Sequence, residues 1–61
     1  MTEEQVSNIY NELLSGKRDK ISFSKGYKLF EEYYELHKQY GVKRKEINQG
    51  SWIEVIVYVE R

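Results

Sequence analysis

The sequence predicts an α+β fold in which two amphipathic helices pack on one face of a small sheet of two or three strands. Apolar residues recur with helical spacing before residue 16, and the same spacing returns between residues 25 and 40. A segment rich in β-branched and aromatic residues follows residue 51. The expected order is α-β-α-(β)-β, and 61 residues leave room for one small domain, 1–61.

The first helix is predicted over residues 3–15. Thr2 and Gln5 have the spacing of a capping box, and Gly16 suits the position just past the C-terminal end of a helix. Apolar residues at i, i+3, i+4, i+7 and i+8 form one face of this helix: Val6, Ile9, Tyr10, Leu13 and Leu14.

A short strand is predicted over residues 20–23, followed by a second helix over residues 25–40 that ends at Gly41. The apolar side of this helix spans about half of its circumference, which is wider than the stripe of about 100° typical of a core-facing helix. We therefore expect one sheet surface to leave part of it uncovered. This side consists of Tyr27, Leu29, Phe30, Tyr33, Tyr34, Leu36, His37 and Tyr40.

The clearest strand is predicted over residues 52–59. Alternation assigns Ile53, Val55, Val57 and Val59 to a core face, and it assigns Trp52, Glu54, Ile56 and Tyr58 to a second face that we expect to be partly covered. A lysine-rich segment, 42–47, predicts an optional further strand that forms a hairpin with this one through residues 48–51.

No catalytic, cofactor or metal site is expected, and no small-molecule substrate. The chain has no cysteine and no glycine-rich phosphate loop, and its one histidine, His37, follows Tyr33 and Tyr34 where a Glu-x-x-His metal motif would need a carboxylate. We expect the His37 ring to pack within the aromatic side of the helix with one nitrogen hydrogen-bonded. Glu31 and Glu35 lie one turn apart among lysines, which is typical of a solvated surface. A metal-assisted enzyme centred on His37 is thus a weaker functional hypothesis than the two described below, nucleic-acid binding and noncatalytic protein interaction.

The N-terminus lacks a basic, apolar leader, and the longest apolar run is far shorter than the roughly 20 residues that span a bilayer. We therefore expect a cytoplasmic protein without a membrane partner. So small a chain, rich in Lys, Glu and Tyr, would be at home in a phage or a mobile element.

Nucleic-acid binding is an alternative function, because basic residues occur in two clusters. The formal net charge of zero and the acidic stretch around Glu31 and Glu32 weaken general attraction to a polyanion, and the absence of a turn between two helices argues against a winged helix. The candidate contacts are Lys17, Arg18, Lys20, Lys25, Lys43, Arg44 and Lys45.

The preferred function is a noncatalytic protein that self-associates as a homodimer, or docks on a larger protein to regulate or inhibit it. Its many tyrosines either build an aromatic core or supply the aromatic anchors common at interfaces, and an obligate dimer would use both. The predicted protein interface consists of Trp52, Ile56, Tyr58, Tyr27 and Tyr34.

Overall fold

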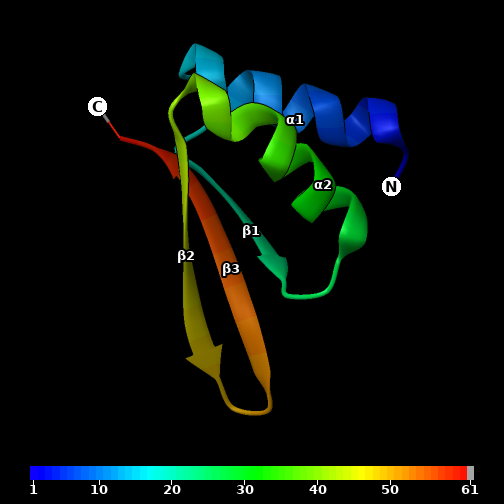
Figure 1. Ribbon diagram of the computed structural model, residues 1–61, viewed down its shortest axis with the longest axis vertical. Coiled ribbons are helices and arrows are strands. Elements are labelled where there is room, and N and C mark those ends of the chain that lie inside the picture. The colour runs from blue at the N-terminus through cyan, green and yellow to red at the C-terminus, as the bar shows by residue number, and fades with distance from the viewer. Residues whose placement is uncertain (61) are drawn as a thin grey trace.

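The computed structural model describes residues 1–60 and confirms the α+β fold, with helices packed on one face of a three-stranded antiparallel sheet (Figure 1). Neither helix in this described part of the chain is both long and apolar enough to cross a membrane. The elements are α1 (Glu3–Ser15), β1 (Lys20–Ser24), α2 (Lys28–His37), a 3-10 turn η1 (Lys38–Tyr40), β2 (Val42–Gln49) and β3 (Trp52–Val59).

Helix α1 has the predicted ends. The Thr2 hydroxyl accepts a hydrogen bond from the Gln5 backbone N–H at 3.2 Å, and the Gln5 side-chain oxygen accepts one from the Thr2 N–H at 2.9 Å. This reciprocal pair satisfies N–H groups that a helix start leaves without partners. Gly16 ends the helix with a φ of +87°, a left-handed conformation that glycine adopts without a steric penalty.

Helix α2 begins at Lys28, three residues later than predicted. The Lys25 N–H still donates to the Ile53 carbonyl at 2.8 Å, so the backbone stays attached to β3 beyond the end of β1. Gly26, with a φ of +106°, then turns the chain toward the helix. The prediction was wrong here because Lys25 continues the pairing with β3 and the positive φ of Gly26 is not helical, so the helix can begin only after these residues. Gly41 ends the segment as predicted.

Strand β3 is the centre of the sheet, with β1 and β2 at the edges. Both neighbours pair with it antiparallel, so that Lys20 and Lys43 lie on either side of Tyr58. The optional strand is present, and it extends to Gln49 instead of residue 47. A two-residue connection that begins with Gly50 therefore joins β2 to β3, which is a common hairpin length.

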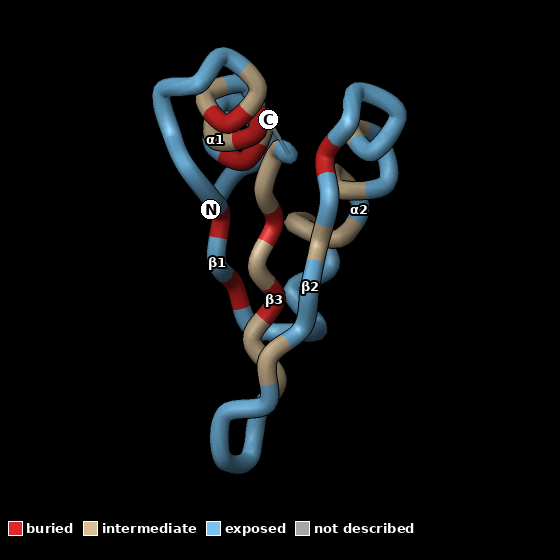
Figure 2. The backbone as a smooth tube through the Cα atoms, turned by 90° about the vertical axis from the view of Figure 1, so that its left-hand side faces the viewer, coloured by how far each residue is buried: buried red, intermediate tan, exposed pale blue. Residues whose placement is uncertain are grey.

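The core lies between α1 and the helix-facing side of the sheet. It is formed by Val6, Tyr10, Leu13, Ile21, Phe23, Val42, Val55 and Val57, and Figure 2 shows these buried positions on α1 and all three strands. Helix α2 contains no fully buried residue. Leu36 on α2, Tyr40 in η1 and Tyr27 just before the helix are more than half exposed. The expectation that one sheet surface leaves part of this segment uncovered is confirmed.

Candidate functional site

The sheet face opposite the helices is uncovered, and we call it the open face. Paired residues on antiparallel strands place their side chains on the same side of a sheet, and the side chains of one strand alternate between sides. The register therefore assigns the following residues to the open face: Lys20, Ser22 and Ser24 of β1, Trp52, Glu54, Ile56 and Tyr58 of β3, and Lys43, Lys45, Ile47 and Gln49 of β2.

The central strand of the open face carries Glu54 among apolar and aromatic side chains, and the two edge strands carry mostly polar ones. Ile47, Ile56 and Tyr58 are only partly exposed although no helix covers them, which matches the partial cover expected for this side of β3. Glu54 accepts hydrogen bonds from the Ser22 hydroxyl and from the Gln49 amide, the latter at 2.8 Å. The carboxylate of Glu54 is thus occupied by neutral donors of the neighbouring strands.

A second feature adjoins the open face, and we call it the aromatic groove. It is a cavity of about 710 Å³ lined by Met1, Ser22, Phe23, Ser24, Tyr27, Leu29, Phe30, Gln49, Trp52 and Glu54. The stacked rings of Phe23 and Phe30, 5.0 Å apart, connect its lining to the core. Tyr27 and Trp52 are 61% and 58% exposed, so two large aromatic side chains of the groove remain accessible to a partner.

The structure brings together four of the five predicted interface residues. Trp52, Ile56 and Tyr58 share the open face, and Tyr27 joins Trp52 in the groove. Tyr34 lies apart: it packs against the core on the helix side, with the Arg44 guanidinium 5.2 Å from its ring centre. Seven residues would place Tyr27 and Tyr34 on one edge of a helix, but Tyr27 precedes the first residue of α2 and does not follow the helical spacing.

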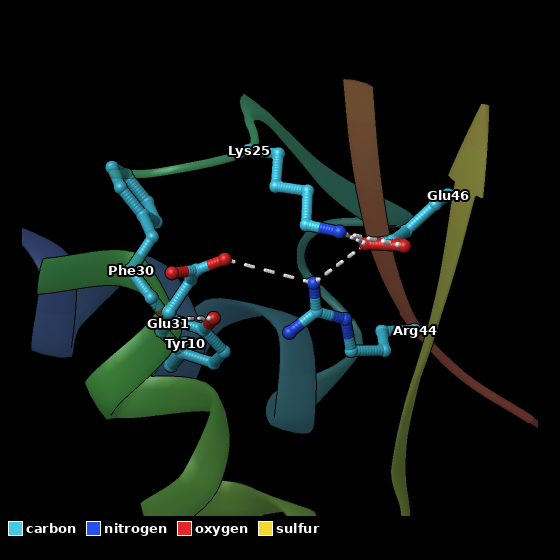
Figure 3. A network of polar contacts seen from close by, with 6 residues as sticks. All are labelled: Tyr10, Lys25, Phe30, Glu31, Arg44 and Glu46. Atoms are coloured by element: carbon cyan, nitrogen blue, oxygen red, sulfur yellow. Dashed lines mark hydrogen bonds and ion pairs between the residues drawn. The ribbon is translucent and has the colours of Figure 1, made fainter. Parts of the chain in front are cut away.

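Several of the predicted nucleic-acid contacts are engaged in ion pairs. Arg44 extends from β2 between Glu31 of α2 and Glu46, with N–O distances of 3.7 and 3.5 Å, as Figure 3 shows. Lys25 reaches Glu46 at 3.0 Å, and its hydrogen bond with that carboxylate holds the pKa of Glu46 below its usual range. Arg18 pairs with a glutamate of α1, Glu12, at 2.9 Å. The Arg44–Glu31 and Lys25–Glu46 pairs join α2 and the preceding turn to the edge strand β2, whereas the Arg18–Glu12 pair joins α1 to the loop that follows it.

The other predicted basic contacts behave differently. Lys20, Lys43 and Lys45 are exposed, form no ion pair within residues 1–60, and lie together on the open face. Lys17 is also exposed, but it lies just beyond the end of α1 and not on the sheet. In the run Lys43-Arg44-Lys45, strand alternation sends the two lysines to the open face and the arginine to the helix side.

His37 has the environment that the sequence predicts. Its Nδ1 atom lies 2.7 Å from the Tyr33 carbonyl oxygen, and its ring stacks on that of Tyr10 at 4.9 Å. Within residues 1–60, no group of three or more His, Asp or Glu side chains is arranged to hold a metal ion. The polar atom at the centre of this aromatic cluster is the Tyr10 hydroxyl, which donates to the Phe30 carbonyl at 2.7 Å.

The aromatic groove was not anticipated from the sequence. Met1, Leu29 and Phe30 line it together with residues of β1 and β3, and no local pattern indicates that these segments meet. Of the residues in the groove, Tyr27 and Trp52 could be predicted from amino-acid type alone, because tyrosine and tryptophan are enriched at protein interfaces.

No protein-family model, curated protein or solved structure matches the chain in comparisons of each kind. The function is therefore inferred from the geometry of the aromatic groove and the open face.

Proposed function

We propose that this chain is a noncatalytic interaction protein that forms a homodimer through the aromatic groove. The observation that carries the proposal is the pairing of an exposed aromatic anchor with an adjoining apolar cavity in one small molecule. Trp52 begins β3 at the end of the β2–β3 hairpin, which projects beyond the helices (Figure 1), and the groove lies beside it. Burying such an anchor in a cavity removes apolar surface from water.

A second copy is the favoured occupant because a twofold interface is self-complementary. If Trp52 of one copy enters the groove of the other, the same contact is formed twice, and both grooves are filled. A standard-size interface buries about 800 Å² on each partner. That area is a substantial part of the 4431 Å² that the chain exposes, so dimerisation would add considerably to a small core.

The lack of a catalytic role is also part of the proposal. The ring of His37 is engaged by Tyr10 and by the Tyr33 carbonyl, so the side chain best suited to proton transfer near neutral pH has a structural role.

The test measures self-association with a matched pair of variants. Light scattering and sedimentation over a range of concentrations should show a dimer for the wild type. Trp52→Ala should raise the dimer dissociation constant by roughly 1000-fold, since each of the two copies loses a central aromatic anchor and such anchors commonly contribute about 2 kcal/mol each. Tyr40→Ala is the control, because Tyr40 is 62% exposed but does not line the groove, and its dissociation constant should stay close to that of the wild type.

Fluorescence gives a second readout, because Trp52 is the single tryptophan. Its emission should shift to shorter wavelength as the dimer forms, since the indole leaves water. Three results would contradict the proposal: a wild type that stays monomeric at high micromolar concentration, equal effects of the two variants, or dimerisation without a change in emission.

A further inference from the structure

We propose that the open face binds single-stranded nucleic acid, a function that goes beyond self-association and uses other side chains. The sheet order places Lys20 and Lys43 on opposite sides of Tyr58, although they are far apart in the sequence. Neighbouring strands lie about 4.8 Å apart, so these two lysines are separated by about 10 Å at their backbones. Lys45 lies one row further along, beside Ile56.

The chemistry of this surface matches that of an unpaired strand. Three ammonium groups without ion-pair partners within residues 1–60 are available to phosphates. Between two of them lies Tyr58, an aromatic ring on which a base can stack. Glu54 is the only acidic residue that the register assigns to this face, and its oxygens already accept hydrogen bonds from Ser22 and Gln49.

The charge distribution restricts such a ligand to the open face. On the helix side, Arg44 and Lys25 are paired with Glu31 and Glu46. The shallow depression there is also lined by Lys28, Glu32 and Glu35, so its four carboxylates outnumber its three cations. This excess of negative charge, and the absence of an unpaired basic cluster among these described residues, makes the depression a poorer site for a phosphate backbone than the open face. Although the net charge of the chain is zero, the charges are separated in space: lysines without ion-pair partners in residues 1–60 lie on the open face, and most of the side chains that carry charge on α2 are acidic.

An unpaired strand is favoured over a duplex because stacking on Tyr58 requires a base that is not already stacked in a helix. Three phosphate contacts on a single strand predict a slope of about −2 for the logarithm of the association constant against the logarithm of the salt concentration. Raising the salt concentration fourfold should thus weaken binding by roughly 20-fold. Binding is expected to be weak at physiological salt and tolerant of sequence.

The experiment uses fluorescence anisotropy with labelled oligothymidylate and oligouridylate at low salt. The variant with Lys20, Lys43 and Lys45 all changed to Gln should bind at least about tenfold more weakly than the wild type. The control changes Lys17, Lys28 and Lys38 to Gln, which removes the same charge away from the open face, and it should bind within about threefold of the wild type.

Further variants distinguish the contribution of base stacking to binding from that of charge, and circular dichroism detects any loss of folding. Tyr58→Val should weaken binding at least about fivefold, whereas Tyr58→Phe should retain it because the ring is kept. Changing Lys20, Lys43 and Lys45 to Arg should also retain binding. Circular dichroism checks the fold of every variant. The Gln variant should still dimerise, so failure of this proposal is distinguishable from failure of the proposed dimer.

Four results would overturn the proposal. Equal losses in the two Gln variants would mean that only total charge matters. No effect of Tyr58→Val would remove the base contact. Duplex bound as tightly as the single strand would mean that unpaired bases are not recognised. Competition by polyglutamate as strong as that by oligothymidylate would mean that the face binds an acidic protein segment instead.

Discussion

Replacing Tyr10 with Phe isolates one hydrogen bond at the centre of the fold. Tyr10 has no exposed surface, and its hydroxyl donates to the Phe30 carbonyl at 2.7 Å, which joins α1 to α2. Tyr10→Phe keeps the ring that stacks on His37 and removes only this bond. The free energy of unfolding should fall by about 1 kcal/mol at neutral pH, which lowers the melting temperature of so small a domain by about 4 to 8 °C.

The same substitution should change the response of the protein to alkaline pH. Burial raises the pKa of the Tyr10 hydroxyl above its ordinary value, so the folded state holds this proton more tightly than the unfolded chain does. Its contribution to stability is therefore fully present below about pH 10 and is lost as the pH rises beyond that value, by at most about 1.4 kcal/mol per pH unit. The difference in the free energy of unfolding between wild type and Tyr10→Phe should therefore shrink above pH 10 and reach zero at about pH 11.

Urea unfolding followed by circular dichroism at neutral and alkaline pH measures this difference. The other five tyrosines are present in both proteins, so their ionisation cancels in the comparison. Tyr27→Phe is the control, because Tyr27 is 61% exposed, and its stability should match that of the wild type at all pH values. Parallel pH profiles for wild type and Tyr10→Phe would refute the reasoning, since they would mean that Tyr10 ionises as readily in the folded state as in the unfolded chain.

Two further predictions concern the edges of the fold. Lys25 holds the pKa of Glu46 below its ordinary value. The contribution of Glu46 to stability is therefore fully present when the pH is above the ordinary pKa, and it is lost as the pH falls through the lowered pKa of the folded state. Wild type should thus lose more stability than Glu46→Gln in acid, which urea midpoints between about pH 5 and 3 would show, and identical profiles would contradict this. Gly41→Ala should cost about 1 kcal/mol in thermal denaturation, because Gly41 has a φ of +94°. A Cβ atom there would meet nothing within 4 Å, so the loss is conformational, and an unchanged melting temperature would contradict it.

The parts of the fold that local chemistry determines could be predicted from the sequence. The ends of α1 depend on Thr2, Gln5 and Gly16, which act on the backbone within a few residues of themselves. The boundaries of β3 follow from a run of β-branched and aromatic residues that only Glu54 interrupts, and the alternation of this run also identifies the face that the helices cover.

The parts that depend on distant contacts could not be predicted. The start of α2 is delayed because Lys25 still pairs with Ile53 of β3 and Gly26 then turns the chain with a positive φ, and no local signal reveals the pairing with that distant strand. The basic run at Lys43-Arg44-Lys45 is one cluster in the sequence, but a strand divides it between two faces. This division follows from the sequence only if residues 42–47 form a strand. That Lys20 lies on the same face as Lys43 and Lys45 follows only from the order of the strands in the sheet.

The central position of β3 has a consequence for how the protein is made. Every strand pairing in the sheet involves β3, yet β3 is synthesised after both of its neighbours. At about 5 to 20 residues per second, the ribosome completes β3 roughly 2 to 7 seconds after β1. During that interval Ile21 and Phe23 lack the strand that pairs with β1 in the finished protein. The sheet therefore cannot form before β3 is made, and a chain interrupted before residue 52 lacks the strand on which both pairings depend.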